Sequence, residues 1–215
     1  MITPGKEWGA PCDAQPDLEV HGGDTDLASA VAQHPGTLIR FTPNADSDIA
    51  RAVGLRAGDP QRNWAVPMDV LRIDDEKLEG RIAVNMAILG TPPDEANWRS
   101  HTLSIDVDGT TTHGFCAVVA TGQYRNGLDL VPRSHPGDGW AELQLYNLPA
   151  RHRAAMKDRL ATGSHLPHPN ITQRRIHTTT LTTPTPLQFD LDGLRLDPVQ
   201  SVSITVVSNA YRLLL

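Results

Sequence analysis

The stretch VHGGDTDLASAVAQHPG, residues 20–36, decides how the first part of the chain is expected to fold. A short apolar run ends in two glycines, and a helical pattern follows from about Asp24 to about His34. Leu27 and Val31 lie four residues apart on one face of this pattern, and a Pro-Gly pair ends it. A glycine turn between a strand and a helix N-terminus is typical of phosphate-binding loops.

A second unit of the same kind follows directly. TLIRF, residues 37–41, predicts a buried strand, and Ile49 and Val53 repeat the helical spacing before a capping Gly54. Residues 18–58 therefore indicate a partial α/β domain. Both of its loops are expected at the C-terminal ends of strands, where open α/β sheets bind their ligands.

The rest of the chain has a different pattern. Residues 1–17 are expected to be an unstructured leader, whereas 59–215 contain short runs that alternate apolar and polar residues. Asp108-Gly109 and Asp192-Gly193 predict two tight hairpins, and one helix is expected within 149–163. The predicted fold class is α/β plus β, with an antiparallel β-sandwich whose last strand could return to the first domain.

Composition and charge limit the classes of function that the chain is expected to have. The chain has 215 residues and a net charge of −6, from 25 acids and 19 bases, which argues against a general nucleic-acid binder. We found no apolar run long enough to cross a membrane and no signal-peptide pattern, so a cytoplasmic location is expected. The two cysteines, Cys12 and Cys116, are expected to be reduced thiols.

The order of several motifs resembles the bacterial diacylglycerol kinases and related lipid kinases, which include the sphingosine kinases. The resemblance covers about residues 18–215. It is carried by Gly22-Gly23-Asp24, DIARAVGL (48–55), GQYRNGLDLVPRSHPGDGWAEL (122–143) and FDLDG (189–193). It implies a nucleotide-binding α/β domain, followed by a β-sandwich domain, with the lipid entering between the two.

The chain departs from the family pattern at each motif. The GGDGT loop reads GGDTD at 22–26, and the GTxND segment reads NADSD at 44–48. The DDG motif reads GDG at 137–139, and the C-terminal DGE reads DGL at 192–194. A strand–helix–strand portion is expected to be missing before the glycine loop, and TPPDEANWRS at 91–100 stands where the family has a helical insertion. The resemblance is thus to a truncated relative with degraded motifs.

The resemblance assigns roles to particular residues, with Mg²⁺ and ATP as the implied cofactors. The nucleotide-binding positions are Gly22, Gly23, Asp24, Thr25, Asn44 and Asp48. Asp138 would be a metal ligand, and Asp192 would be the general base that takes the proton of a lipid hydroxyl. The residues alone also allow simpler roles, since acids favour helix N-termini and Asp-Gly pairs favour turns.

Asp26 bears on whether the chain binds ATP. A carboxylate about 5 Å from a phosphate charge costs roughly 3 kcal/mol at an effective dielectric near 20. We therefore expect ATP-dependent phosphoryl transfer to a lipid hydroxyl to be impaired or lost, as in a pseudoenzyme. The alternative function is a non-catalytic protein that binds a lipid, another hydrophobic small molecule or a protein partner. An open sheet edge in the α/β part also predicts a homodimer.

Overall fold

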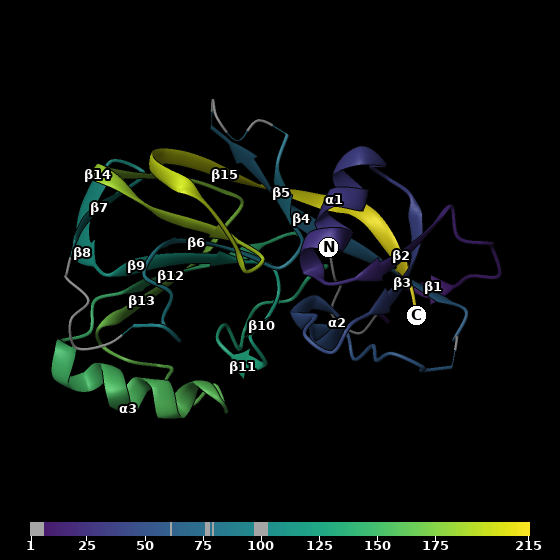
Figure 1. Ribbon diagram of the computed structural model, residues 1–215, viewed down its shortest axis with the longest axis horizontal. Helices are drawn as coiled ribbons and strands as arrows, with labels where there is room; N and C mark the ends of the chain where they lie inside the picture. Colours follow the sequence, from purple (N-terminus) through teal and green to yellow (C-terminus); the bar gives the residue numbers. More distant parts are fainter. Residues whose placement is uncertain (1–6, 61, 76–77, 79, 97–102) are drawn as a thin grey trace.

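The computed structural model describes residues 7–60, 62–75, 78, 80–96 and 103–215 (Figure 1). The first half contains β1 (Ala10–Pro11), β2 (Leu18–Gly22), α1 (Asp24–Gln33), β3 (Leu38–Pro43), α2 (Asp48–Ala52) and β4 (Trp64–Asp74). The strands before the third helix are β5 (Ile82–Ala83), β6 (Met86–Gly90), β7 (Leu103–Val107), β8 (Thr110–Gly114), β9 (Cys116–Ala120), β10 (Tyr124–Arg125), β11 (Leu128–Asp129) and β12 (Ala141–Tyr146). The chain ends with α3 (Ala150–Leu160), β13 (Ile171–Ile176), β14 (Thr178–Leu191) and β15 (Leu194–Leu214).

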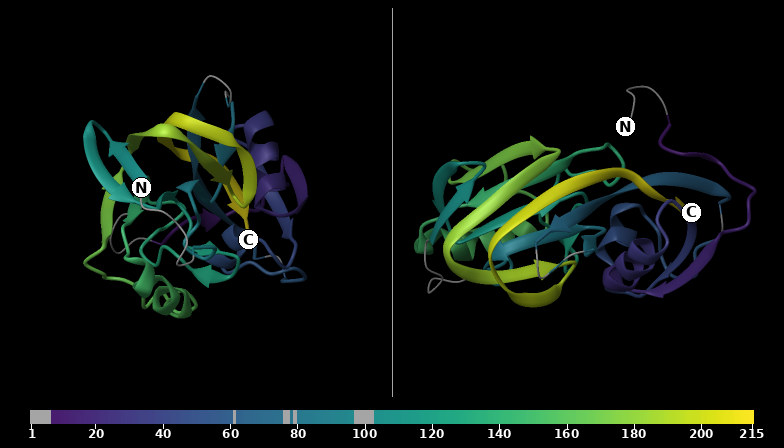
Figure 2. Two further views of the ribbon diagram at one scale, coloured as in Figure 1. Left: turned by 60° about the vertical axis from the view of Figure 1, so that its left-hand side comes forward. Right: turned by 90° about the horizontal axis from the view of Figure 1, so that it is seen from above.

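The long strand β15 joins the two halves of the molecule. β15 pairs antiparallel with β14 and β4, and its last residues pair parallel with β3, where Arg212 lies opposite Leu38. Figure 2 shows β15 running from the sandwich to the helical end. One mixed sheet, with the order β1-β4-β15-β14-β6-β9-β12-β13, therefore extends through both regions. A domain boundary between residues 58 and 59 remains a prediction.

The α/β part forms as the glycine-loop stretch predicted. α1 spans Asp24–Gln33, and its Leu27 and Val31 are buried against Phe41 of β3 and Ile49 of α2. β2 pairs parallel with β3, so the loops after both strands emerge at the same edge of the sheet. This edge is where the candidate site lies.

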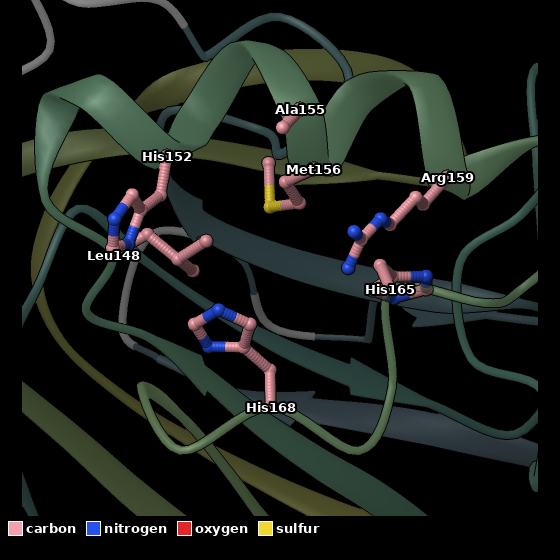
Figure 3. A pocket seen from close by; sticks show the side chains of 7 residues that line it. All are labelled: Leu148, His152, Ala155, Met156, Arg159, His165 and His168. Carbon is pink, nitrogen blue, oxygen red and sulfur yellow. The ribbon is translucent and has the colours of Figure 1, made fainter.

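The sandwich buries both faces of β6, β9 and β12. Leu143 of β12 packs in one cluster with Phe189 of β14, while Tyr146 faces a second cluster that contains Met156 of α3. Figure 3 shows Met156 directed from α3 toward the sheet. Every residue of β12 is consequently buried, although its sequence alternates between apolar and polar residues.

Both predicted Asp-Gly hairpins are confirmed. Val107 pairs with Thr110 across Asp108-Gly109, and Leu191 pairs with Leu194 across Asp192-Gly193. The φ angles are 52° and 80° in the first turn and 51° and 85° in the second. Two consecutive positive φ angles define the type I′ turn, whose twist matches that of paired strands.

The expected leader is wrong for residues 7–17. Ala10 and Pro11 form β1 and pair with β4, and the indole of Trp8 donates to the carbonyl of Pro67 at 3.1 Å. The Trp8 ring also meets His135 edge-on, with 4.6 Å between ring centroids. These contacts order the segment because a large aromatic side chain gains from partial burial. Residues 1–6 of the expected leader and 97–100 of TPPDEANWRS lie outside the described residues.

None of the helices in the described residues has both the length and the apolar character needed to cross a membrane.

Candidate functional site

A pocket of about 320 Å³ lies where the loops after β2 and β3 meet the β14–β15 hairpin. We call it the junction pocket. Six residues selected from the sequence line it: Gly23, Asp24, Thr25, Asn44, Asp48 and Asp192. Gly22 lies immediately before Gly23 in the same loop, whereas Asp138 does not line the pocket. Fold topology therefore brings together residues that are up to 169 positions apart, from Gly23 to Asp192.

Asp24 ties the two loops to each other. Its Oδ1 accepts the hydroxyl of Ser47 at 2.6 Å, and its Oδ2 accepts the backbone N–H of Ile49 at 3.1 Å. Burial raises the pKa of Asp24 to about 6, although both hydrogen bonds oppose this shift. Its carboxylate thus holds the N-terminus of α2 by accepting these two hydrogen bonds.

Asp48 ties α2 to the β10–β11 hairpin. Its carboxylate accepts the backbone N–H of Asn126 at 2.6 Å and that of Gly127 at 2.8 Å. Burial raises the pKa of Asp48 above its usual value, and the two backbone bonds partly offset the shift. The residue therefore connects the α/β part to the sandwich.

Asp192 lines the junction pocket and holds the segment between β5 and β6. Its Oδ1 accepts the N–H groups of Asn85 and Met86 at 3.0 and 2.9 Å, and its Oδ2 accepts that of Val84 at 2.8 Å. Burial, followed by the nearby charge of Asp24, raises the pKa of Asp192 to about 7 against the effect of these bonds. Three N–H donors occupy most of its acceptor capacity, but Oδ2 retains one lone pair.

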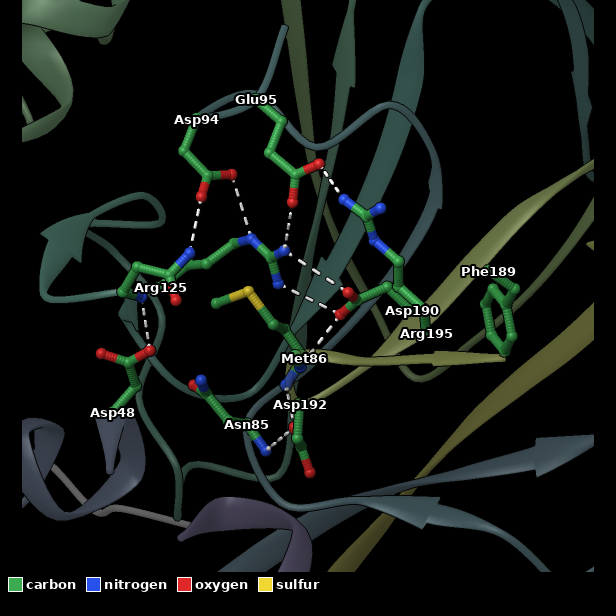
Figure 4. Close-up of polar contacts among 12 residues, drawn as sticks. Asp48, Asn85, Met86, Asp94, Glu95, Arg125, Phe189, Asp190, Asp192 and Arg195 are labelled. Atoms are coloured by element: carbon green, nitrogen blue, oxygen red, sulfur yellow. Dashed lines mark hydrogen bonds and ion pairs between the residues drawn. The ribbon is translucent and has the colours of Figure 1, made fainter. Parts of the chain in front are cut away.

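Arg125 is the basic side chain of the junction pocket and is already paired (Figure 4). Its guanidinium lies 3.1 Å from Asp190, 3.0 Å from Asp94 and 3.4 Å from Glu95. Burial alone would lower the pKa of Arg125, but the charges of Asp190 and Asp94 outweigh it and raise the pKa. This buried ion-pair group leaves little positive charge for a ligand.

The Asp26 carboxylate lies against the glycine loop. Its Oδ2 accepts the backbone N–H of Gly23 at 2.8 Å, and a Cβ added to Gly22 would collide with the same carboxylate. Gly22 has a φ of 133°, a conformation that L side chains rarely adopt. The loop therefore keeps the backbone form of a phosphate cradle, with a carboxylate of the protein itself against it.

A second pocket of about 320 Å³ adjoins the first along α1; we call it the α1 groove. Thr25, Asp192 and Leu194 line both pockets, so the two are contiguous. Ala28, Ala32, Ile82 and Leu191 supply apolar surface to the groove. Leu194 is 46% exposed and is the one exposed large hydrophobic side chain among the described residues.

The residues around Asp138 do not fit a magnesium ion. One carboxylate oxygen accepts the N–H of Trp140 at 3.0 Å, and the other pairs with Arg175. Nor do the described residues contain a group of three His, Cys, Asp or Glu side chains that could hold a metal. The metal-ligand role of Asp138 remains only an implication of the resemblance.

Sequence reasoning missed Arg125 as part of the site. The residue stands in the quoted stretch GQYRNG, but its partners lie 30, 31 and 65 positions away. The usable signal was the Asp94-Glu95 pair, since adjacent acids need a cationic partner when they are buried.

Comparisons with known proteins show which family and which solved structures this chain resembles. Residues 86–215 match the family described as the YegS C-terminal NAD kinase beta sandwich-like domain, whereas no curated protein matches the chain. A diacylglycerol kinase of Bacillus anthracis str. Sterne is 18% identical, with a TM-score of 0.69 over 92% of this chain and 76% of that chain.

Two further solved structures show the same likeness. A protein of the same strain, described as a candidate diacylglycerol kinase, is 15% identical, with a TM-score of 0.72 over 92% of this chain and 78% of that one. Yeast NADH kinase complexed with NADH is 12% identical, with a TM-score of 0.51 over 92% of this chain and 62% of that one. At these identities the likeness concerns the fold, and it confirms the predicted α/β-plus-β class.

Proposed function

We propose that this chain, which belongs to the family of the YegS C-terminal NAD kinase beta sandwich-like domain, uses its kinase-like fold to bind a lipid alcohol and does not transfer phosphate from ATP. The apolar part of the ligand would lie in the α1 groove, and its hydroxyl would reach Asp192 in the junction pocket. The observation that carries the proposal is the hydrogen bond from Gly23 N–H to Asp26.

This hydrogen bond bears on ATP because a tethered carboxylate competes with any phosphate. Asp26 is part of the same helix turn as the glycine loop, so its effective concentration there exceeds that of millimolar nucleotide. A phosphate that displaced it would still lie within a few ångströms of its negative charge, at a cost of roughly 3 kcal/mol at 5 Å. Both effects disfavour a triphosphate.

The remaining charges of the junction pocket act in the same direction. Asp24, Asp46, Asp48 and Asp192 line it, whereas its basic residue, Arg125, is already shared among three acids. ATP needs positive charge or magnesium to bind, and the described residues contain no group of three His, Cys, Asp or Glu side chains that could hold a metal. A neutral hydroxyl avoids this repulsion and can donate to the free lone pair of Asp192.

The apolar half of the ligand is inferred from the groove. Leu194 stands where the family motif has a glutamate, and its exposed side chain joins the apolar wall that Ile82 and Leu191 form. An alkyl chain that covered Leu194 would gain about 1.5–3 kcal/mol from burying a leucine-sized surface. The replacement favours lipid binding and removes an acid from the site.

The test is calorimetric titration with two probes, dioctanoylglycerol and magnesium–ATP. We expect dioctanoylglycerol to bind and Leu194→Asp to weaken it at least about tenfold, because a charge replaces apolar contact. Gln200→Asp, at an exposed position of the same strand outside the groove, is the matched control. Magnesium–ATP should give no heat at about 1 mM. Absence of dioctanoylglycerol binding to the folded wild-type chain would refute the proposal.

A second candidate is an active ATP-dependent lipid kinase with Asp192 as the general base. Its support is the pKa of Asp192, which at about 7 suits a group that accepts a proton near neutrality. Loss of phosphate transfer in Asp192→Asn, with unchanged dioctanoylglycerol binding, would favour this candidate over the first.

The homodimer and the cytoplasmic location remain proposals. The homodimer is supported by β2, which pairs with β3 along one edge and has no partner strand along the other within the described residues. Light scattering of the purified chain tests it, and a monomeric mass at about 100 µM would exclude a stable dimer.

A further inference from the structure

A third pocket, of about 200 Å³, lies between α3 and the loop that follows it; we call it the α3 pocket (Figure 3). It shares no lining residue with the junction pocket or the α1 groove. α3 lies under the sandwich, away from α1 and α2 (Figure 1). Whatever this pocket binds, it does so separately from the proposed lipid-alcohol site.

The accessible wall of the α3 pocket is apolar, and polar side chains lie around its ends. Leu148, Ala155 and Met156 form the apolar wall. Arg159 and His165 lie together at one end in Figure 3, and histidine side chains lie at the other. A ligand that matches this wall carries an apolar body with a polar group at its head.

The hydrogen bonds of His165 fix which of its ring nitrogens is free. Nε2 lies 3.2 Å from the carbonyl of Leu130 and 3.3 Å from the hydroxyl of Tyr146, which gives its own hydrogen to Gln144. Both neighbours can therefore only accept, so Nε2 carries the proton. In the neutral ring that burial favours, Nδ1 is an acceptor.

This Nδ1 acceptor has no partner. His165 is only 2% exposed, and its Nδ1 is among the buried polar atoms without a hydrogen bond in the described part of the chain. A buried acceptor without a donor is destabilising, so a ligand that brings an O–H group would satisfy it. Because His165 lines the pocket, its free nitrogen favours a ligand with a donor at this end.

Arg159 adds a cation beside the His165 ring. Its side chain takes no part in any hydrogen bond or ion pair found among the described residues, and Figure 3 shows its guanidinium beside the His165 ring. Guanidinium groups bind carboxyl and other oxyanion groups through parallel N–H donors. The head group must therefore accept from Arg159 while donating to His165.

We propose that the α3 pocket binds a medium-chain aliphatic carboxylic acid, with its carboxyl group between Arg159 and His165 and its chain against Leu148 and Met156. One carboxyl oxygen accepts from the guanidinium, and the acid proton lies between the other oxygen and Nδ1 of His165. A cavity of about 150 Å³ holds a benzene-sized ligand, so this pocket accommodates a body of roughly six to eight carbons.

The test titrates the full chain with octanoate, and with octylamine and 1-octanol as probes of the same length. We expect octanoate to bind most tightly, with a perturbed imidazole resonance of His165 in NMR spectra. Arg159→Gln should weaken octanoate at least about tenfold, as for the loss of a charge-assisted hydrogen bond. Lys157→Gln removes a cation of the same helix that does not line the pocket, and should leave the affinity unchanged.

A second pair of variants tests the cavity itself. Ala155 is exposed on α3 and lines the pocket, so Ala155→Trp should fill it and abolish binding, whereas Ala154→Trp on the same helix should not. The proposal is overturned if octanoate fails to bind at about 10 mM, if octylamine binds equally well, or if Arg159→Gln has no effect. Dioctanoylglycerol binding should be unchanged in Ala155→Trp, which separates this site from the junction pocket.

Discussion

The carboxylate of Asp26 accepts the backbone N–H of Gly23 at 2.8 Å, at the turn that leads from β2 into α1. An acid that pairs with its own helix N-terminus stabilises that helix. In the proposed function, the same acid also stands in the way of a phosphate at the glycine loop. Under the proposed function, one side chain thus combines a favourable local role with the loss of an anion site.

Asp24 provides a pH-dependent prediction. Its folded pKa of about 6 lies above the unfolded value of about 3.9, so the native state holds this proton more tightly. The stability that Asp24 contributes is fully present below about pH 4 and is lost as the pH rises through about 6. The difference in unfolding free energy between the wild type and Asp24→Asn should therefore shrink across this window, by about 1–3 kcal/mol.

Urea denaturation at several pH values measures this difference. The exposed Asp46→Asn is the matched control because its carboxylate lines the same pocket. A difference between the wild type and Asp24→Asn that grows with pH would show that the two hydrogen bonds of Asp24 outweigh its burial.

Replacement of Arg125 should be among the most destabilising changes in the chain. Arg125→Met leaves Asp190, which is 1% exposed, and Asp94 without their cation, and breaking a buried pair costs about 3–5 kcal/mol. Arg195→Gln removes an exposed arginine that pairs with Glu95 and should change stability by less than about 1 kcal/mol. Equal unfolding midpoints for the two variants would contradict the ion-pair group.

The junction between the two regions depends on Asp48. Asp48→Ala removes the acceptor of the Asn126 and Gly127 amides, so both should exchange hydrogen faster than in the wild type. The loss of stability should be about 1–3 kcal/mol, since two partly buried donors lose their partner. Mass spectrometry of peptides that cover 122–131 measures the exchange, and unchanged rates there would show that these bonds do not hold the hairpin.

The tight turns and the helix boundaries of the fold could be predicted from sequence, because each depends on neighbouring residues. The Asp192-Gly193 turn and the α1 boundaries depend on φ angles, spacing and capping within a few positions. The ordering of Trp8 could not, since it arises from contacts with Pro67 and His135 that only the folded chain provides.

For the candidate site, the sequence selected residues that line one pocket, but it did not predict their hydrogen-bond partners. Asp24, Asp48 and Asp192, which were selected from the order of motifs, line one pocket. Each carboxylate, however, accepts N–H groups from segments 25 to 108 positions away. Long-range hydrogen bonds of this kind depend on the register of the whole sheet, which a motif does not record.

The measurement that tests the central claim most directly is transfer of radiolabelled γ-phosphate from ATP to dioctanoylglycerol, with magnesium and the purified chain. If the Asp26 carboxylate has replaced the phosphate at the glycine loop, the wild type should give no product above a blank without protein. Product that forms in the wild type and disappears in Asp192→Asn would contradict the account and identify the chain as an active lipid kinase.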